Sequence, residues 1–266
     1  DVNDSQPFYT SNPVNITLAH NGTLTNSELI RKRCKMNKKE IKKRVEELST
    51  VQEWNHQYML PFGIRTKKKD IESPGYNPNK WQRLLPIFAS YIEDTIESCI
   101  DVGCSDGYYC IEGAKIFKNT HFTGLDLDPI RIERANFVKE VLEIDNVDFI
   151  HEDLYNLISK NIQFDLVMGL GLLHRVPDLD KCIEDLAKTS KKYLILEFKS
   201  LGGEELTFLD HGGETKSNKL NGLYKTPTLN YVKEELRKLG FSCIYSTSEG
   251  SNLKFPRTIM VGKKDE

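Results

Sequence analysis

The sequence predicts an α/β fold, in which a doubly wound, mostly parallel sheet of seven strands has helices on both faces. Two observations favour this fold. Short apolar segments alternate with helical segments from residue 98 onward, and strand and helix take turns repeatedly. Each of the first three predicted strands also has an acidic residue at or just after its end, and the carboxyl ends of parallel strands are where such sheets bind ligands.

The predicted elements follow from hydrophobic periodicity and from the turn residues between segments. The strands are short and largely apolar, and cover residues 98–104, 121–127, 146–151, 164–170, 193–199, 241–247 and 256–263. The helices have apolar residues at intervals of three and four, and cover residues 78–92, 107–117, 128–144, 179–190 and 228–239. The last two strands are close enough in sequence to pair as an antiparallel hairpin at one edge of the sheet.

The N-terminal part of the chain lacks this alternation. Residues 1–27 are rich in Asn, Ser and Thr and have no regular period. From residue 28 to 50 the pattern is that of a basic, partly amphipathic helix or helix pair, and residues 61–80 are predicted to be a loop because they are rich in turn formers. We therefore expect three parts, which are an N-terminal piece (1–27), a basic helical extension with a loop (28–74) and the sheet domain (75–266).

Composition and charge limit the possible partners. The chain is 38% hydrophobic, which excludes a disordered protein, and its formal net charge is −2. Contact with nucleic acid therefore needs a local patch, for which the basic helix 31–44 is the candidate. We find no membrane-spanning stretch and no signal peptide, and the six cysteines lack metal-ligand spacing. These observations predict a cytoplasmic protein with reduced thiols and no metal site.

The candidate ligand site begins with the segment DVGCSDG (residues 101–107), where the first strand ends and a helix begins. A sharp turn that approaches a ligand needs small residues, so Gly103, Ser105 and Gly107 are predicted to line the ligand. Dinucleotide-binding proteins have G-x-G-x-x-G at this turn, whereas here Asp101 precedes the first glycine. Its carboxylate repels a pyrophosphate but suits an ammonium or sulfonium charge, which favours S-adenosylmethionine over NAD.

Residues after the second and third strands extend this site. Asp126 follows Gly107 by nineteen residues and can accept hydrogen bonds from both ribose hydroxyls. Leu127 is predicted to lie on one face of the adenine ring. The Asp153 carboxylate and the Leu154 N–H can bind the amino group and a ring nitrogen of adenine. Because adjacent parallel strands end at the same edge of the sheet, the three acids are predicted to form one site.

These residues resemble the class I S-adenosylmethionine-dependent methyltransferases, over about residues 80–264. The resemblance rests on DVGCSDG, GLDLD, HEDL and FDLVMGLGLLHRVPD. It implies a Rossmann-like methyltransferase fold, S-adenosylmethionine as the donor, and a fourth strand, with Gly169, beside cofactor and substrate. Ser105 stands where that family most often has glycine. The alternatives are a cofactor-binding module without catalysis and an NAD-dependent dehydrogenase, which Asp101 and Ser105 disfavour.

Within that family, the segments KWQR (80–83), GLLHR (171–175) and YKTPTLNYVKEELRKLGF (224–241) resemble the branch of the tRNA wobble-uridine carboxymethyltransferase. That resemblance implies carboxymethyl transfer from carboxy-S-adenosylmethionine, with basic side chains that bind the extra carboxylate. Leu173 replaces the tyrosine that precedes the His-Arg pair in that branch. Methyl transfer to a small molecule or an RNA nucleoside is therefore the main hypothesis, and carboxymethyl transfer to tRNA is the alternative.

Residues 5–27 resemble a fragment of the glutaminase domain of glutamine phosphoribosylpyrophosphate amidotransferase, in QPFY and ITLAHNGTLTN. In that family the pair that matches Asn21 and Gly22 helps to form an oxyanion hole for a cysteine nucleophile. Residue 1 is Asp and most of that domain is missing, so we expect a remnant without glutaminase activity.

Methyl transfer needs in-line alignment, and a base when the nucleophile carries a proton. His174 and Arg175, directly after the fourth strand, are the candidate catalytic residues, His174 to accept a proton and Arg175 to orient an anionic group. The alternative for His174 is a structural role, as a helix cap or in a backbone hydrogen bond. Candidates for lining the substrate pocket are Lys80, Trp81 and Arg83.

Weaker candidates lie further along the chain. Glu197, at the end of the fifth strand, and His211 are of the types that serve as a base or a metal ligand. Residues 200–225 have the length and glycine content of a substrate lid, which is predicted to become ordered when substrate binds.

Overall fold

The computed structural model describes residues 36–67, 77–211, 224–249 and 255–266 of the chain. The glutaminase-like piece 1–27 lies outside the described residues. So do residues 28–35 of the predicted basic helix and residues 212–223 of the predicted lid. The functions suggested for these segments stay predictions.

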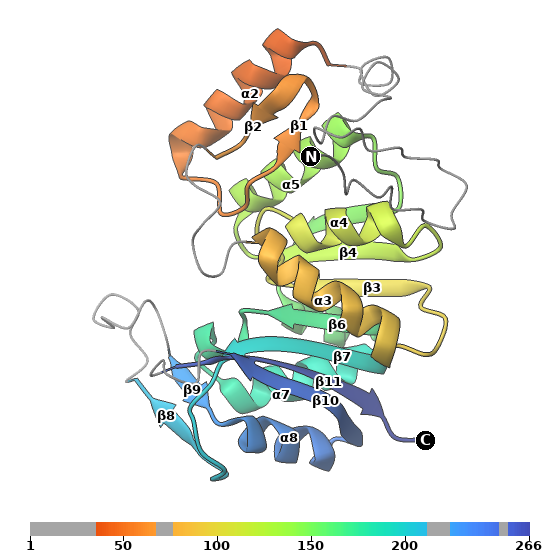
Figure 1. Cartoon of the computed structure of the whole chain (residues 1–266), viewed down its shortest axis with the longest axis vertical. Coiled ribbons are helices and arrows are strands. Elements are labelled where there is room, and N and C mark those ends of the chain that lie inside the picture. Colours follow the sequence, from red (N-terminus) through yellow and green to blue (C-terminus); the bar gives the residue numbers. More distant parts are fainter. Residues whose placement is uncertain (1–35, 68–76, 212–223, 250–254) are drawn as a thin grey trace, which may run out of the picture.

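A seven-stranded sheet lies at the centre of the molecule and confirms the predicted fold class (Figure 1). In sheet order the strands are β10 (Phe241–Glu249), β11 (Arg257–Lys264), β7 (Ser190–Lys199), β6 (Phe164–Leu170), β3 (Ser98–Val102), β4 (His121–Asp126) and β5 (Val147–His151). All neighbours pair in parallel except β11, which is antiparallel to both β10 and β7. The strand order reverses between β3 and β6, and ligands bind at such a reversal, beside the carboxyl ends of the strands.

The predicted hairpin of the last two strands forms, but its reversed strand lies inside the sheet. β11 inserts between β7 and β10, so β10 is the edge strand. The reason is burial, because Ile259, Met260 and Val261 of β11 are all 0% exposed and need cover on both faces. Most residues of β10 are half-buried or exposed, as suits an edge.

Helices cover both faces of the sheet (Figure 1). One face packs against α3 (Asn77–Tyr91), α4 (Tyr108–Ile116) and α5 (Pro129–Leu142), and the other against α6 (Leu154–Ser159), α7 (Leu179–Thr189) and α8 (Leu229–Lys238). Alternate strand residues belong to the two layers of the core. On β7, for example, Ile195 packs toward α3–α5 and Leu196 toward α7 and α8. The six-residue α6 is too short for a periodic pattern, and the sequence-based prediction lacks it.

An N-terminal unit packs beside α5 at one end of the molecule (Figure 1). It consists of α2 (Lys38–Val51), the strands β1 (Met59–Leu60) and β2 (Ile64–Arg65), and the turn η1 (Pro61–Gly63). α2 begins at a capping box, in which Asn37 accepts the backbone N–H of Glu40 and the Glu40 side chain accepts that of Asn37. Its buried apolar face consists of Ile41, Val45 and Leu48. The part of the predicted basic helix that is described is therefore amphipathic, as expected.

Two short strand pairs lie in segments that were predicted to be loops. β1 pairs with β2 near the start of residues 61–80, and β8 (Phe208–Asp210) pairs with β9 (Lys225–Pro227) around residues 200–225. Strands of two or three residues leave no alternation for a sequence pattern to detect. β9 contacts η2 (Leu173–Arg175), so the described ends of the predicted lid border the loop after β6.

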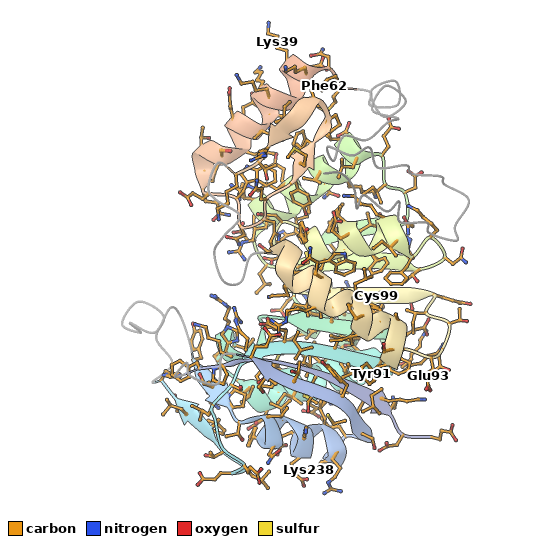
Figure 2. The ribbon with its side chains drawn as sticks, viewed as in Figure 1. Lys39, Phe62, Tyr91, Glu93, Cys99 and Lys238 are labelled. Atoms are coloured by element: carbon orange, nitrogen blue, oxygen red, sulfur yellow. The ribbon has the colours of Figure 1, made fainter. Side chains whose placement is uncertain are left out.

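The side chains follow these layers (Figure 2). Cys99 on β3 is fully buried in the middle of the sheet, whereas Lys39 and Lys238 lie at opposite ends of the molecule and are exposed. Among the helices of the described residues, none combines the length and the apolar character that crossing a bilayer demands.

Candidate active site

Five charged residues share one face of the sheet, at the carboxyl ends of the parallel strands. Strand residues two apart point to the same face, and Cys99, Phe122 and Ile195 pack in the core on the α3–α5 face. The same alternation then assigns the charged residues near the strand ends to this face. They are Asp101, Asp126, Glu197, Lys199 and, through its direct pairing with Lys199, Arg257. Acids thus lie at β3 and β4, and a mixed cluster lies at β7 and β11.

The loop between β3 and α4 is tightly folded, and its small residues are required by geometry. The N–H of Gly103 donates to the carbonyl of Leu125 at 2.8 Å. Gly107 has a φ of +81°, and a Cβ atom there would lie 2.5 Å from the ring of Phe149. Ser105 is also left-handed, with a φ of +54°. This conformation explains why glycine suits the position of Ser105 in a loop of this kind.

The end of β4 places Asp126 and Leu127 beside this loop. Asp126 accepts the N–H of Ser105 at 2.8 Å through Oδ2 and that of Asp128 at 2.9 Å through Oδ1. Each carboxylate oxygen keeps a second lone pair that a ligand hydroxyl can use. Leu127 is 66% exposed, so its apolar surface is open to a ligand.

The end of β5 lies next to the end of β4, because Asp126 pairs with His151. The His151 ring lies 2.9 Å from the carbonyl oxygen of Leu127, measured from Nε2. Two residues further on, Asp153 caps α6 by accepting the N–H of Tyr155 at 3.0 Å. The structure therefore brings the three predicted acids to three neighbouring strand ends.

The carboxyl group of Asp101 is buried. The residue is 1% exposed, and neither oxygen has a hydrogen bond to any residue that the structure describes. Burial raises the pKa of Asp101 to about 8 against the opposing effect of Lys80, and the charge of Asp126 adds to the rise. A cationic ligand group would stabilise the ionised form, and S-adenosylmethionine carries both an ammonium and a sulfonium. The residues present therefore fit this cofactor.

The N-terminal unit contacts the same loop through Asp106. One carboxylate oxygen of Asp106 accepts the N–H groups of Asn55 and His56, at 2.6 and 3.1 Å. The Asp106 carbonyl accepts the hydroxyl of Tyr58 at 2.7 Å. The Asn55 amide also donates to the hydroxyl of Ser105 at 2.7 Å. The predicted extension is thus part of the site, and sequence reasoning missed it because the partners are 48 to 51 positions apart.

Arg134 of α5 fixes this arrangement from the interior. Its side chain is 0% exposed, and Nη1 lies 3.5 Å from Oδ1 of Asp106, whose side chain is also 0% exposed. The guanidinium also donates to the backbone carbonyls of Leu48, Gln52 and Glu53. The chain that follows α2 is therefore held to α5 and to the loop by one buried cation.

Glu197 is held between two cations on the opposite side of the site. It is 1% exposed, with Oε2 2.9 Å from Nζ of Lys80 and Oε1 3.2 Å from Nη1 of Arg257. The Lys80 ammonium also lies 5.5 Å from the centre of the Tyr109 ring. Lys80, a predicted pocket residue, therefore joins α3 to the ends of β7 and β11.

His174 is fully buried, and its Nδ1 accepts the backbone N–H of Lys199 at 3.2 Å. A neutral ring that accepts at Nδ1 carries its proton at Nε2. Burial, reinforced by the charge of Arg257, lowers the pKa of His174 to about 2. Nε2 has no hydrogen-bond partner within the described part of the chain. In this arrangement the free nitrogen is an N–H donor, whereas the sequence suggested a proton acceptor. The backbone hydrogen bond matches the structural alternative.

Two predicted pocket residues are engaged in other contacts. Trp81 is 6% exposed and packs in the core against Phe88, with ring centres 5.9 Å apart. Arg83 pairs with Glu249 at the end of β10, at 2.7 Å. Their amphipathic spacing on α3 does not distinguish core from pocket, so the sequence could not separate these roles.

Gly169 and His211, two further residues that the sequence analysis singled out, also contact other parts of the protein. A Cβ atom at Gly169 would lie 3.1 Å from Leu196, on the side of the sheet that faces α7. His211 lies 2.9 Å from the Thr226 hydroxyl, between β8 and β9. Across residues 36–67, 77–211, 224–249 and 255–266, no group of three or more His, Cys, Asp or Glu has the arrangement of a metal site.

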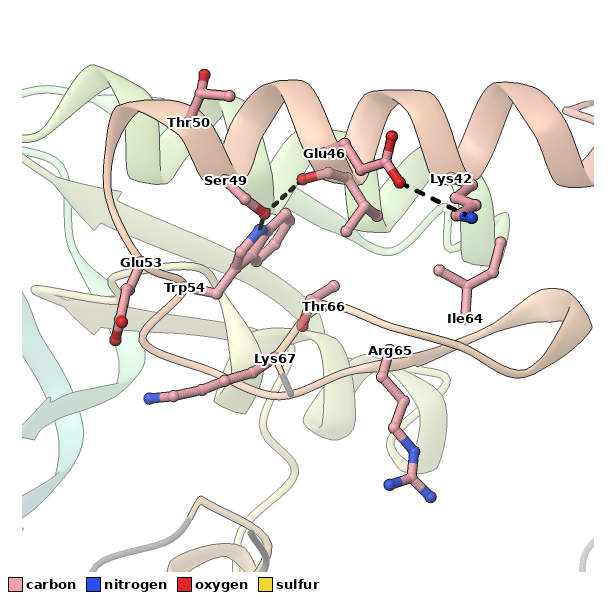
Figure 3. Close-up of a pocket in the computed structure, with 11 residues that line it drawn as sticks. Lys42, Glu46, Ser49, Thr50, Glu53, Trp54, Ile64, Arg65, Thr66 and Lys67 are labelled. Atoms are coloured by element: carbon pink, nitrogen blue, oxygen red, sulfur yellow. Dashed lines mark hydrogen bonds and ion pairs between the residues drawn. The ribbon is translucent and has the colours of Figure 1, made fainter. Parts of the chain in front are cut away.

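A separate cavity of about 630 Å³ lies in the N-terminal unit, between α2 and the segment 64–67 (Figure 3). Trp54 lines it and donates from Nε1 to the Ser49 hydroxyl at 3.0 Å. Residues of the predicted cofactor site do not line this cavity. It is therefore distinct from the site at the strand ends.

The sheet order, the reversed β11 and the acids at the ends of β3, β4 and β5 together define the class I methyltransferase fold. A profile of the family described as "Methyltransferase domain" matches residues 94–242. Because that match covers more than half of the chain, the chain belongs to this family. The further assignment to the wobble-uridine branch does not follow from this match.

A curated protein is similar to part of this chain. The uncharacterized protein RP789 of Rickettsia prowazekii (strain Madrid E) is 28% identical over 104 residues, which are 39% of this chain and 19% of that protein. This chain therefore matches only about a fifth of that relative's length.

Solved structures share the fold at low identity. The N-terminal domain of EvdMO1 with S-adenosylhomocysteine bound has a TM-score of 0.67 and 19% identity, and the match covers 87% of this chain and 98% of that one. Magnesium protoporphyrin IX methyltransferase from Synechocystis PCC 6803, also with S-adenosylhomocysteine bound, has a TM-score of 0.54 and 20% identity. That match covers 70% of this chain and 83% of the other chain. The cyclase SpnF has a TM-score of 0.60 and 13% identity, and the match covers 85% of this chain and 93% of the other chain. The fold alone thus occurs with more than one activity, and the acceptor must be argued from this chain's own residues.

Proposed function

We propose that this chain transfers the methyl group of S-adenosylmethionine to an acceptor, a small molecule or an RNA nucleoside, at the carboxyl ends of β6 and β7. The observation that carries the proposal is the buried carboxylate of Asp101, which has no partner among the described residues. An isolated buried carboxylate is costly, and a site built to receive a cation accounts for it.

The residues around Asp101 suit the rest of this cofactor. Asp126 keeps lone pairs for the ribose hydroxyls, and the exposed Leu127 can pack on the adenine ring. Asp153 and the Leu154 N–H are the candidates for the adenine edge. Gly103 and Gly107 keep the loop free of side-chain bulk. When bound, the cofactor supplies an electrophilic methyl group on a sulfonium sulfur.

On the acceptor side, Arg175 is exposed beside the end of β6 and is the candidate for orienting an anionic group. We assign His174 the role of a neutral hydrogen-bond donor, because its Nδ1 is engaged by the backbone of Lys199. Lys80 holds Glu197 in place between the cofactor side and the acceptor side.

Ordinary S-adenosylmethionine fits better than carboxy-S-adenosylmethionine. Lys80 and Arg257, two basic residues near the cofactor position, already pair with Glu197. Leu173 also lacks the hydroxyl of the tyrosine that the wobble-uridine branch has at this position. A small acceptor is favoured over RNA, because basic residues of α2 pair within the chain. Those pairs are Lys42–Glu46, Lys43–Glu47 and Arg44–Glu47.

Calorimetric titration with S-adenosylmethionine, carboxy-S-adenosylmethionine and NAD tests the proposal. We expect S-adenosylmethionine to bind tightest, and Asp101→Asn to weaken its binding about tenfold or more, as loss of a charged partner implies. Lys118→Gln, on the surface loop after α4, is the matched control and should leave the affinity unchanged. Tighter binding of NAD, or equal affinity of the Asp101→Asn variant, would contradict the proposal. Binding without transfer to any acceptor would favour the non-catalytic module.

A further inference from the structure

We infer that the acceptor offers an ionised carboxylate to the methyl group, so that the product is a methyl ester. This inference rests on the proposed function and names the chemical class of its acceptor. Two features of the described residues carry it. One is an excess of positively charged side chains at the ends of β6, β7 and β11. The other is that Glu197 and His174, the groups beside these cations that could accept a proton, are already engaged.

The cluster has more positive than negative charge. Lys80 and Arg257 each bind one oxygen of Glu197. In the part of the chain that the structure describes, neither Arg175 nor Lys199 has a hydrogen bond or ion pair through its side chain. Of these four cations, only Lys80 and Arg257 have a carboxylate partner among the described residues.

These cations are close enough to affect one another. Lys199 and Arg257 are directly paired across β7 and β11 and so share a face. Partial burial and the charges of Arg257 and Arg175 lower the pKa of Lys199, against the opposing effect of Glu197. Partial burial of its guanidinium and the charge of Arg257 likewise lower the pKa of Arg175, against the opposing effect of Glu197. An anion placed among them would relieve this repulsion.

The same cluster borders the carboxylate that we assign to the cofactor. Lys80 binds Glu197 directly and also acts on the pKa of Asp101. Asp101, Glu197 and Lys199 point to one face of the sheet by strand alternation. An anion held by Arg175 and Lys199 would therefore lie on the same side of the sheet as the cofactor's cationic part.

Of the groups beside the cluster that usually accept a proton, Asp101 is assigned to the cation of the cofactor, and Glu197 and His174 are already engaged. The Glu197 carboxylate is shared between two cations, and His174 presents an N–H at its free nitrogen. An alcohol or carbon acceptor would need a base to remove its proton. An amine acceptor is protonated at neutral pH and would be repelled by the cations. A carboxylate, with an ordinary pKa of about 4, arrives already ionised.

The reaction balances without a proton transfer. A carboxylate oxygen of the acceptor forms the new bond to the methyl carbon, and the carbon–sulfur bond breaks with its electron pair on sulfur. The negative charge of the carboxylate and the positive charge of the sulfonium disappear together. Arg175 and Lys199 hold and orient the second carboxylate oxygen.

Binding to simple probes gives the first test. The full chain, saturated with S-adenosylhomocysteine, is titrated with benzoate and cinnamate and with the two corresponding amides. We expect each acid to bind about tenfold or more tightly than its amide, and this preference to disappear in the double variant Arg175→Gln, Lys199→Gln. Lys191→Gln, at the other end of β7, is the matched control and should keep the preference. Equal binding of acids and amides overturns the inference.

The chemistry of the product gives the second test. The protein is incubated with methyl-labelled S-adenosylmethionine and a pool of cellular metabolites, and the labelled products are treated with alkali. A methyl ester releases its label as volatile methanol, whereas methyl groups on nitrogen, carbon or an ether oxygen stay bound. Alkali-stable label as the main product overturns the inference, as does the absence of any transferred label.

A third measurement separates this inference from its main rival. If the cations bind a carboxylated donor, carboxy-S-adenosylmethionine will bind tighter than S-adenosylmethionine, and Arg257→Gln will remove that difference. That outcome also overturns the inference. The proposed function is tested separately by the first calorimetric titration, in which S-adenosylmethionine must bind tighter than NAD and Asp101→Asn must weaken that binding.

Discussion

The Arg134 guanidinium and the Asp106 carboxylate lie 3.5 Å apart in the interior, where both side chains are 0% exposed. Asp106 belongs to the glycine loop and Arg134 to α5, and both also bind the backbone between α2 and β1. The cofactor loop and the N-terminal unit are therefore stabilised by the same pair. Removing one partner of a buried pair leaves the other charge uncompensated, which is strongly destabilising.

We predict that Arg134→Met lowers the free energy of unfolding by about 3–5 kcal/mol, because it leaves the buried Asp106 charge without its cation and removes the donor to three backbone carbonyls. Urea denaturation followed by circular dichroism measures this change. Arg44→Met is the matched control, since Arg44 also joins α2 to α5, through Glu133, but at the surface. It should cost about 1 kcal/mol or less. Similar losses in the two variants would mean that burial of the Arg134 pair has no special effect.

Gly107 gives a prediction about the loop itself. In Gly107→Ala the new Cβ would lie 2.5 Å from the ring of Phe149, in a conformation with a φ of +81°. We expect a loss of about 2–4 kcal/mol of stability, from backbone strain and overpacking, and weaker cofactor binding. Thermal denaturation and calorimetry measure the two effects.

The control for Gly107 is Gly240→Ala, because Gly240 has a similar φ of +77° but nothing within 4 Å of the added atom. It should show backbone strain alone, about 1 kcal/mol, with no change in cofactor affinity. If the two variants are equally stable, the contact with Phe149 does not restrict the loop.

The sequence predicted the sheet domain well, because its elements have clear periods. The seven strands and the helices from α3 to α8, except α6, lie within a few residues of their predicted bounds. Asp101, Asp126 and Asp153 could be placed together because parallel strands end at one edge of the sheet. The position of β11 inside the sheet depends on burial on both of its faces, which an apolar run such as TIMVG leaves open.

The rest of the site depends on contacts between distant segments. Asp106, Asn55 and Arg134 have no spacing that marks them, and their roles are visible only once α2 packs on α5. For His174, the position after β6 suggested a base, but the hydrogen bond from the Lys199 backbone sets which nitrogen carries the proton. Trp81 shows the same limit, because a core tryptophan and a pocket tryptophan have the same spacing on a helix.

Asp101 makes cofactor binding depend on pH. In the free protein its pKa is about 8, so the carboxyl is largely protonated at neutral pH, whereas a bound cation favours the ionised form. Binding should therefore release a proton, and affinity should rise up to about tenfold per pH unit below pH 8 and then level off. Calorimetry in buffers of different ionisation enthalpy measures the released proton. Asp101→Asn should bind without this dependence.

The same pKa sets the sign of a stability effect. Between pH 4 and about 8 the folded state holds a proton on Asp101 that the unfolded chain has lost, so stability from this group falls as pH rises through that window. Asp101→Asn should therefore be more stable than the natural protein at pH 8 in the absence of cofactor. If the natural protein binds the cofactor with the same affinity at pH 6 and at pH 8, Asp101 does not face the cationic group of the cofactor.

Asp126 tests where the ribose lies. Asp126→Ala removes a charged acceptor and should weaken binding of S-adenosylhomocysteine by about 1.5–3 kcal/mol, measured by calorimetry. Because Asp126 also accepts the N–H groups of Ser105 and Asp128, Asp126→Asn, which keeps one carbonyl oxygen, should lose less than the alanine variant. Asp148→Ala, an exposed acid on the neighbouring strand β5, is the control and should bind normally. Unchanged affinity in a folded Asp126→Ala protein would place the ribose away from the end of β4, and the assignment of Leu127 and Asp153 to adenine would then fall with it.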